Sequence, residues 1–375
     1  MFESKEFEIN ILHIAPAYQA KGGGIFEVVE NLSSSQCKDQ KNSVDIVCLD
    51  TFKASTSQNK QVYNILPSKI TQFFATYELI KFMATQLKGY DFIHIHGAWS
   101  FQLFFVSLFI QSHKETIFYQ PHGLLCPIRV RKSWFIKKLA WQIYQKSFLK
   151  NCKNIICCSN KEAKELSCIS EDPCKIKMIP NGLDGEFFRP INNLTKRLNR
   201  FMFFSQVIPI KNLESVFYAI AELKNKDSHE IFLDIYGYGD SSYIAKLKDL
   251  ILTLSISKNI SFKGPVKRSE RVAVYDRYTY FILPSLSENF AIVVLEALSR
   301  GCKAFVSTET PWVDFNHENL ILMDLNRNSI YSSLKSHLIS KYNVNDFDYK
   351  AITNLKEFEW DSISHQLGKV YCSID

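Results

Sequence analysis

The stretch PSLSENFAIVVLEAL at residues 284–298 follows a short apolar run, Tyr280–Leu283. The run predicts a buried strand, and the stretch itself predicts a loop and then a helix that begins near Phe290. A strand, a loop and a helix in this order are the building unit of parallel α/β sheets. Glu288 lies on the predicted loop and Glu296 about two helical turns later, so both carboxylates can border one ligand. An unpaired carboxylate among apolar neighbours would be costly, which favours a binding role for Glu296 over an ordinary helix position.

The same unit recurs along the chain, because short apolar runs alternate with longer helical patterns. This alternation predicts an α/β fold with parallel sheets, and runs that are apolar throughout suit strands covered on both faces. In the first half we predict strands at Ile9–Ala15, Val44–Leu49, Phe92–His96, Ile117–Gln120, Ile155–Cys158 and Lys177–Ile179. In the second half we predict strands at Arg200–Phe204, Ile231–Tyr236, Ile260–Phe262, Tyr280–Leu283 and Lys303–Ser307.

A strong breaker, Pro180-Asn181-Gly182, separates these two sets of strands. A chain of 375 residues also suits two domains. We therefore predict one domain over residues 1–182 and a second over 183–357. The last segment, 358–375, has helical spacing and predicts a final helix.

Composition narrows the classes of function. The hydrophobic fraction of 46% supports a core in each half, and the net charge of +7 favours an anionic partner without the dense basic stripe of a nucleic-acid binder. The ten Cys show no zinc spacing, and the polar start MFESKEFEIN shows no secretory signal. We therefore expect reduced thiols in a cytoplasmic protein. The longest apolar run, Phe101–Ile110, is too short to span a bilayer.

Candidate binding residues follow the strands of the first half, where open parallel sheets bind ligands. The glycines Gly22–Gly24 open a predicted helix, and their N–H groups either face an anion or belong to a plain surface loop. Histidines lie at the ends of two further strands, in His94–Trp99 and at His122. Without a third ligand in place, they do not predict a metal site. A neutral histidine can instead donate a hydrogen bond to a hydroxyl or a developing charge, and His122 is the better candidate.

The segment RVRKSWFIKKLAWQIYQKSFLK, residues 129–150, mixes aromatic and basic residues at helical spacing. Such a helix either lies at a membrane interface or is a long helix with a solvated basic face.

Candidate residues also follow the strands of the second half. Lys211 lies near a predicted helix start, where a lysine can hold a diphosphate and offset the charge of a departing nucleotide. The turn Gly237–Asp240 leads into another helix, and Val266 follows Gly264-Pro265, where backbone groups could edge a nucleobase. The N–H groups of residues 290–293 lie at the start of the predicted helix, where free backbone N–H groups suit phosphates.

The glutamate pair in SENFAIVVLEAL resembles the signature of family four glycosyltransferases, which are retaining enzymes of the GT-B fold. The resemblance covers nearly the whole chain, because further segments fall in the expected order: Gly22–Gly24, HGAW, PHGLL, KMIPNGLD, Lys211, Thr310-Pro311-Trp312 and the Trp-containing final helix. Within the family, HGAW, PHGLL and KKLAWQIYQ together resemble transferases that build bacterial O-antigen, capsule or exopolysaccharide chains.

The resemblance implies two Rossmann-like domains facing a central cleft, with acceptor bound by residues 1–182 and a nucleotide sugar by residues 183–357. The final helix would cross back onto the first domain. Glu288 would contact the donor sugar, Glu296 the ribose and Lys211 the diphosphate. His122 would lie by the reacting sugar. The further residues implied on the donor side are Gly23, Gly24, Gln206, Gly237, Tyr238, Val266, Asn289, Phe290, Ala291, Ile292 and Val293, and those on the acceptor side are His96 and Trp99.

The implied reaction is a front-face displacement in which the leaving diphosphate helps to deprotonate the acceptor. It needs no metal and no cofactor, because the nucleotide-sugar donor is a substrate. The implied acceptor is a lipid-linked oligosaccharide on the cytoplasmic face of the inner membrane, which residues 129–150 could contact. No nucleic acid is involved.

Two residues depart from the family pattern. Gln206 stands where an arginine usually helps to neutralise the diphosphate, and its loss should cost about 2–4 kcal/mol of transition-state stabilisation if nothing compensates. Ala291 replaces a common glycine, a mild change provided that its φ is negative.

Three alternatives remain open. The sequence Asp346-Phe347-Asp348 resembles the metal-binding motif of the other large transferase fold, although its position favours a solvated turn. A nucleotide-sugar epimerase could use the same fold and its histidines. A non-enzymatic subunit that has lost turnover would explain Gln206.

Overall fold

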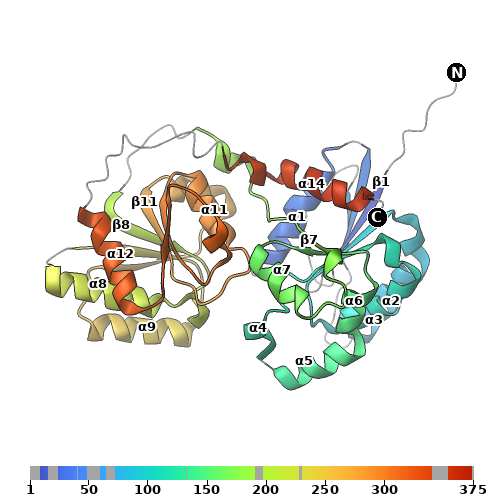
Figure 1. Cartoon of the computed structure of the whole chain (residues 1–375), viewed down its shortest axis with the longest axis horizontal. Helices are drawn as coiled ribbons and strands as arrows, with labels where there is room; N and C mark the ends of the chain where they lie inside the picture. The colour runs from blue at the N-terminus through green and yellow to red at the C-terminus, as the bar shows by residue number, and fades with distance from the viewer. Residues whose placement is uncertain are drawn as a thin grey trace. The chain divides into compact units, whose positions relative to one another are not determined.

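The structure of the chain is a computed structural model, and it describes residues 9–15, 24–39, 41–48, 60–64, 72–131, 133–190, 197–227, 230–339 and 354–373. The chain divides into two compact units, one formed by Met1–Gly182 with Trp360–Asp375 and the other by Leu183–Glu359. Each unit contains one parallel sheet flanked by helices (Figure 1).

The sheet of the first unit has the strand order β3-β2-β1-β4-β5-β6-β7. Its strands are β1 Ile9–Ala15, β2 Asn42–Cys48, β3 Lys60–Asn64, β4 Phe92–His96, β5 Ile117–Gln120, β6 Asn154–Cys157 and β7 Ile176–Met178. Its α-helices are α1 Gly24–Gln36, α2 Gln72–Gln86, α3 Phe101–Ser107, α4 Pro127–Arg131, α5 Trp134–Ala140, α6 Lys146–Asn151, α7 Asn160–Ser167 and α14 Trp360–Cys372.

Alternate residues of each strand pack into different cores of this unit, as the two-residue period of a strand requires. On β1, Leu12 and Ile14 join α2, α3 and α6 in one core, whereas Ile11 joins α1 and α14 in the other. The C-terminal helix α14 lies along α1 in Figure 1. Where the chain leaves this unit, a Cβ on Gly182 would lie only 2.5 Å from the ring of Trp360, so this close approach requires glycine.

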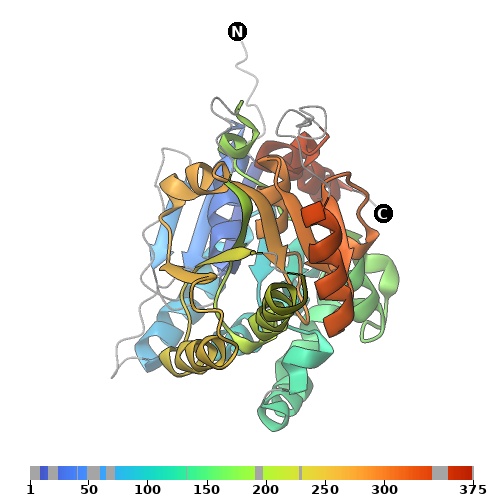
Figure 2. The ribbon, with the colours of Figure 1, turned by 90° about the vertical axis from the view of Figure 1, so that its left-hand side faces the viewer.

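The sheet of the second unit has the strand order β10-β9-β8-β11-β12-β13. Its strands are β8 Arg197–Phe204, β9 Phe232–Tyr236, β10 Ile260–Gly264, β11 Tyr278–Leu283, β12 Lys303–Ser307 and β13 Leu320–Met323. Its α-helices are α8 Leu213–Asp227, α9 Ser241–Thr253, α10 Arg271–Tyr275, α11 Ile292–Ser299 and α12 Arg327–Ile339. Helix α8 packs against α9 and α12 (Figures 1 and 2), and α10 packs against α11.

The predicted strands are present, four of them with the predicted bounds: β1, β4, β5 and β12. Two strands, β3 and β13, were missed. Both lie at an edge of their sheet, as do β7 and β10, which were predicted. The helix expected from Phe290 begins at Ile292, and the final helix begins at Trp360 rather than at residue 358.

Strand order reverses at one point in each sheet, between β1 and β4 in the first unit and between β8 and β11 in the second. Open parallel sheets bind ligands at such switch points, beyond the carboxyl ends of the strands. Among the described residues, no helix is both long enough and apolar enough to cross a bilayer.

Candidate functional site

The loops that leave β8 and β11 meet at the switch point of the second sheet. The Leu286 N–H donates to the carbonyl of Ile210 at 2.8 Å. Across this junction the Lys211 ammonium pairs with the Glu288 carboxylate, and the Ser285 hydroxyl donates to the same carboxylate at 2.7 Å. The two charged side chains are 12% and 11% exposed. A partly exposed ion pair of this kind can contact a ligand with both charges, while each charged side chain holds the other in place.

Helix α11 starts directly after this loop, close to the predicted position. Its first residue is Ile292, and the preceding Ala291 has φ 60° and ψ 65°. The condition for a mild change at Ala291, a negative φ, is therefore not met, and a left-handed alanine costs roughly 1–2 kcal/mol relative to glycine. The loop is held nonetheless, because Trp312 donates through its ring N–H to the carbonyl of Phe290 at 2.6 Å.

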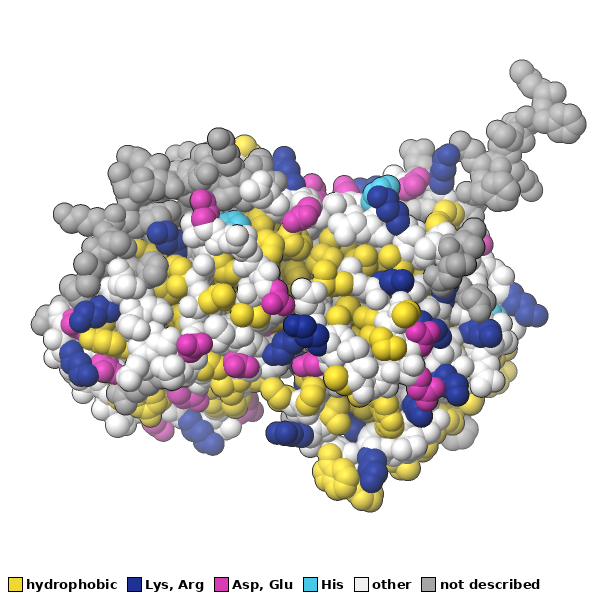
Figure 3. All heavy atoms as spheres, in the orientation of Figure 1, with side chains coloured by type: hydrophobic (Ala, Val, Ile, Leu, Met, Phe, Trp, Pro, Cys, Tyr) yellow, Lys and Arg dark blue, Asp and Glu magenta, His cyan; other side chains and the backbone are white. Residues whose placement is uncertain are grey.

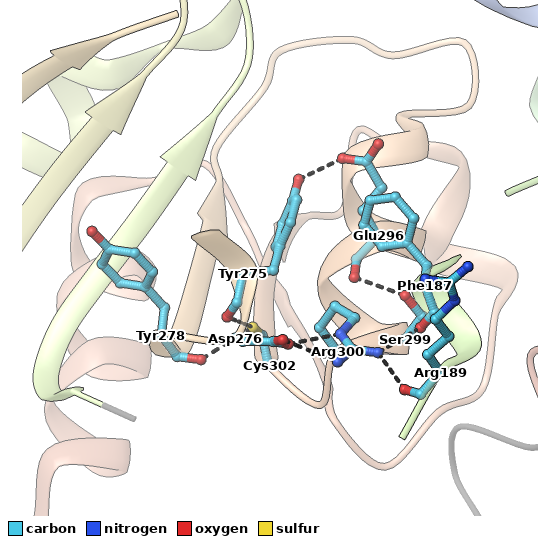
Figure 4. Close-up of polar contacts among 9 residues, drawn as sticks. All are labelled: Phe187, Arg189, Tyr275, Asp276, Tyr278, Glu296, Ser299, Arg300 and Cys302. Atoms are coloured by element: carbon cyan, nitrogen blue, oxygen red, sulfur yellow. Dashed lines mark hydrogen bonds and ion pairs between the residues drawn. The ribbon is translucent and has the colours of Figure 1, made fainter. Parts of the chain in front are cut away.

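Glu296 lies inside the second unit, with a side chain that is only 2% exposed. It is not the unpaired carboxylate that the sequence suggested. The Tyr275 hydroxyl donates to it at 2.7 Å, and the Arg271 guanidinium lies 3.3 Å away (Tyr275 in Figure 4). Burial, with the charge of Glu296 beside it, raises the pKa of Tyr275 well above its usual value. The cost of burying Glu296 is thus offset within the protein, with or without a ligand.

One turn further along α11, Arg300 makes a second buried contact with the same part of the chain. Its guanidinium binds both carboxylate oxygens of Asp276, at 2.7 and 3.1 Å, and donates to the carbonyls of Phe187 and Arg189 (Figure 4). Arg300 is 1% exposed. The sequence analysis overlooked it, although a basic residue at the end of an apolar helix is the signal that could have found it.

The three loops after β8, β9 and β10 are joined by backbone contacts. A Cβ on Gly237, which has φ +132°, would lie 1.8 Å from the Ser205 carbonyl oxygen, so no other residue fits there. Beside it, Gln206 donates to the Tyr238 hydroxyl at 2.5 Å, and both side chains are exposed. Val266, in the loop after β10, is half-buried. The glycine turn thus serves close packing between loops, and it brings Gln206 and Tyr238 together.

The switch point of the first sheet holds histidines instead of charges. His94 and His96 on β4 and His13 on β1 have fully buried side chains, and His122 after β5 is 7% exposed. Hydrogen bonds of 2.9 Å join His13 to His96 and His96 to His122. Burial lowers the pKa of His13 to about 4 and that of His122 to about 3, so these rings are neutral at pH 7.

The sequence did not single out His13, which lies inside β1 and pairs in register with His94 of β4. It supplies the third imidazole that the sequence did not place: ring nitrogens of His13, His94 and His96 lie within 4.8 Å of one another. The rings are stacked or tilted by 22–35°, and His13 and His96 hydrogen-bond each other directly. Stacked rings do not aim their lone pairs at one point, so the geometry suits a hydrogen-bonded series better than a metal.

The turn that carries His122 is held by a residue that the sequence analysis did not single out. His122 has φ 55°, an uncommon backbone conformation for this residue type. The buried Glu162 accepts hydrogen bonds from the N–H groups of Gly123, at 2.5 Å, and Cys158, at 2.9 Å. Trp99 is half-buried, and its ring N–H donates to the Leu124 carbonyl at 2.7 Å. Together these contacts fix the loops after β4, β5 and β6.

Some candidates fall outside the part of the chain that the structure describes. Gly22, Gly23 and Asp346-Phe347-Asp348 are among them, whereas Gly24 is the exposed first residue of α1.

Two family models match the chain one after the other. The model described as Glycosyltransferase Family 4 matches residues 22–187, and the model described as Glycosyl transferases group 1 matches residues 184–318. The chain belongs to the family four glycosyltransferases. The loop with Lys211 and Glu288 thus lies in the group 1 part of this glycosyltransferase, and the histidines 94, 96 and 122 lie in the other part.

Relatives of this family four glycosyltransferase include the UDP-Gal:alpha-D-GlcNAc-diphosphoundecaprenol alpha-1,3-galactosyltransferase of Escherichia coli, 28% identical over 236 residues. That match covers 58% of each chain, so the protein spans under two thirds of this curated relative. The GDP-mannose:cellobiosyl-diphosphopolyprenol alpha-mannosyltransferase of Komagataeibacter xylinus is 19% identical, and the match covers 97% of this chain and 93% of that one.

Solved structures share the GT-B fold of this family four glycosyltransferase. Anabaena HepE in complex with UDP-glucose superposes with a TM-score of 0.75 at 14% identity, over 98% of this chain and 100% of that one. WaaG, a glycosyltransferase involved in lipopolysaccharide biosynthesis, gives a TM-score of 0.68 at 12% identity, over 98% and 100% of the two chains. At these identities the likeness establishes the fold, including both parallel sheets.

Proposed function

We propose that the protein is a retaining glycosyltransferase that moves a sugar from a nucleotide-sugar donor to a lipid-linked saccharide in bacterial surface polysaccharide synthesis. The observation that carries the proposal is the Lys211–Glu288 ion pair at the switch point of the second sheet. Relatives that act on diphosphopolyprenol-linked acceptors support this choice of acceptor. Residues 183–357 then bind the donor and residues 1–182 the acceptor.

Each proposed role follows from the chemistry of the side chain. Lys211 holds the diphosphate and offsets the negative charge that grows on the leaving group. Glu288 accepts hydrogen bonds from the donor sugar, and its pairing with Lys211 aligns it for this before the donor arrives. The N–H groups at the start of α11 face the phosphates. Glu296 accepts hydrogen bonds from the ribose hydroxyls. Its carboxylate makes these in addition to its contacts with Tyr275 and Arg271.

On the first unit, we propose that His122 lies by the reacting sugar and that Trp99 lines the acceptor site. His96 has hydrogen bonds at both ring nitrogens, so it acts through His122 rather than on the acceptor directly. The reaction is a front-face displacement and needs no metal.

The test measures nucleotide release by the purified full chain, with UDP- and GDP-sugars and an undecaprenyl-diphosphate-linked saccharide, in EDTA throughout. We expect release that depends on the acceptor, and at least a hundredfold lower rate for Glu288→Gln. The matched control is Glu222→Gln, which removes a carboxylate from a surface i,i+4 pair on α8. No release with any donor, or equal rates for Glu288→Gln and the parent, would overturn the proposal. Conversion of the donor sugar without acceptor would identify an epimerase.

The Gln206 position offers a second test of the donor side. Gln206 is exposed and bonded to Tyr238, so an arginine fits there without displacing a buried group. We expect Gln206→Arg to raise kcat by about tenfold, less than the full 2–4 kcal/mol of a diphosphate contact because Lys211 already supplies one charge. An unchanged or lower kcat would show that the missing arginine does not limit the reaction.

We also propose that the α4–α5 region docks on the anionic cytoplasmic face of the inner membrane. Trp134, Phe135, Ile136 and Leu139 are 57–72% exposed, and Figure 3 shows apolar and basic side chains gathered over the α5 end of the first unit. Residues 127–151 contain seven Lys and Arg and no acidic residue. Exposed apolar side chains within a purely basic segment match an anionic lipid surface better than a solvated helix.

Co-sedimentation with vesicles tests the docking surface. We expect binding to phosphatidylglycerol vesicles, weak binding to phosphatidylcholine vesicles, and loss of binding in Phe135→Glu/Ile136→Glu. The control is Leu252→Glu, a change at an apolar side chain of α9 that is 66% exposed. Equal binding by the double variant and the parent would contradict the proposal.

A further inference from the structure

A continuous row of hydrogen bonds runs from α1 to the proposed reaction site through buried side chains. The Gln36 amide oxygen lies 2.7 Å from Nε2 of His13. Nδ1 of His13 lies 2.9 Å from Nε2 of His96, and Nδ1 of His96 lies 2.9 Å from Nε2 of His122. Gln36 is 3% exposed. Both links between histidines join Nδ1 of one ring to Nε2 of the next.

The direction of the row follows from counting protons. A neutral imidazole carries one N–H and one lone pair, and an amide oxygen can only accept. His13 must therefore donate through Nε2 to Gln36, which leaves its Nδ1 as an acceptor. His96 then donates through Nε2 to His13, and its own Nδ1 accepts. His122 consequently donates through Nε2.

The orientation of the Gln36 amide is given by its contact with His13, in which the amide oxygen rather than the amide nitrogen faces Nε2 of His13.

We propose that Gln36 is a positioning residue that sets the tautomer of His122 through His13 and His96. The proton of His122 lies on Nε2, and Nδ1 carries the lone pair. Nδ1 makes no hydrogen bond to any residue that the structure describes. His122 therefore accepts a hydrogen bond from a substrate hydroxyl, where the sequence analysis had it donate one. The substrate class rests on the proposed glycosyltransferase function, whereas the tautomer does not.

The experiment observes the imidazole nitrogens by long-range 1H–15N correlation in the full chain at pH 7, with His122→Asn to assign the signal. We expect His122 to be protonated at Nε2. Gln36→Met removes the acceptor at similar volume, so the two tautomers should approach equal population, and Gln36→Glu, which again offers only acceptors, should restore the Nε2–H form.

Gln145→Met is the matched control, because Gln145 is also a buried glutamine of the first unit but bonds Tyr119 and Trp99 instead. It should leave the His122 signal unchanged. A parent protein with His122 protonated at Nδ1, or a Gln36→Met variant with an unchanged tautomer, would overturn the proposal. Nucleotide release is measured separately, so a protein without transferase activity that still shows the Nε2–H form would refute the proposed function alone.

Discussion

The two sheets of this protein reverse strand order in the same way but fill the switch point with different chemistry. Between β1 and β4 lie buried histidines that burial keeps neutral. Between β8 and β11 lies a partly exposed pair of opposite charges, Lys211 and Glu288. Depth accounts for the difference, because a charge is tolerated where water or a partner reaches it, whereas a buried polar group is cheapest when neutral and hydrogen-bonded. The fold thus supplies the location, and burial selects the kind of polar group.

The largest expected effect comes from breaking a buried charge pair of the second unit, at the C-terminal end of α11. Arg300→Met leaves Asp276 and the carbonyls of Phe187 and Arg189 without their donor, so the free energy of unfolding should fall by about 3–5 kcal/mol. Urea unfolding measures this loss. Arg189→Met, at a side chain that is 71% exposed, should cost less than about 1 kcal/mol. Equal losses in the two variants would contradict the assignment of Arg300 as a buried anchor.

The second effect concerns activity rather than stability. Lys211→Met keeps the length of the side chain but removes its charge, so kcat should fall at least a hundredfold, about 2.7 kcal/mol. Lys226→Met, at a side chain of α8 that is 64% exposed, is the control. A large loss of stability with unchanged kcat would mean that the Lys211–Glu288 pair is structural and that the two switch points do not differ in function.

The third effect is a dependence of the free energy of unfolding on pH, which we expect from the neutral histidines of the first sheet. The folded pKa values of His13, about 4, and His122, about 3, lie below the ordinary value of 6.5, so the unfolded chain binds protons first as the pH falls. The free energy of unfolding should decline from about pH 6.5 toward pH 4, by up to roughly 1.4 kcal/mol per pH unit for each histidine. His122→Asn should flatten this decline, and the same change at the exposed His365 should not. A flat profile in the parent would show that these histidines do not stay neutral.

The smallest effect tests the backbone at the mouth of the charged site. Ala291→Gly relieves a left-handed alanine but adds freedom to the unfolded chain, so we expect the protein to gain at most about 1 kcal/mol. Ala297→Gly, inside α11, should lose about 1 kcal/mol because its backbone is helical. Thermal unfolding of both variants gives the sign. A loss in Ala291→Gly would mean that the methyl group is needed where it lies.

The sequence alone determined the parallel α/β class, the strands inside the two sheets and the order of the family segments. It did so because strands buried on both faces must be apolar throughout, so their pattern is local. The edge strands β3 and β13 were not predicted, whereas the edge strands β7 and β10 were. The positions of Lys211, Glu288 and His122 after strands could likewise be predicted from the sequence, because the carboxyl ends of parallel strands lie at one edge of a sheet.

Tertiary structure alone decided which partner each of these groups has. Glu296 looked unpaired in its helix, yet Tyr275 and Arg271 reach it from the segment around α10. His13, inside a strand, joined the histidines only because β1 pairs with β4. Hydrogen bonds and ion pairs depend on the distance between atoms, and residues 83 positions apart, such as His13 and His96, meet only when the chain is folded. The sequence thus determined which residue types are present at the two switch points. Burial and contacts in the folded protein determined the charge state, tautomer and pairing of these side chains.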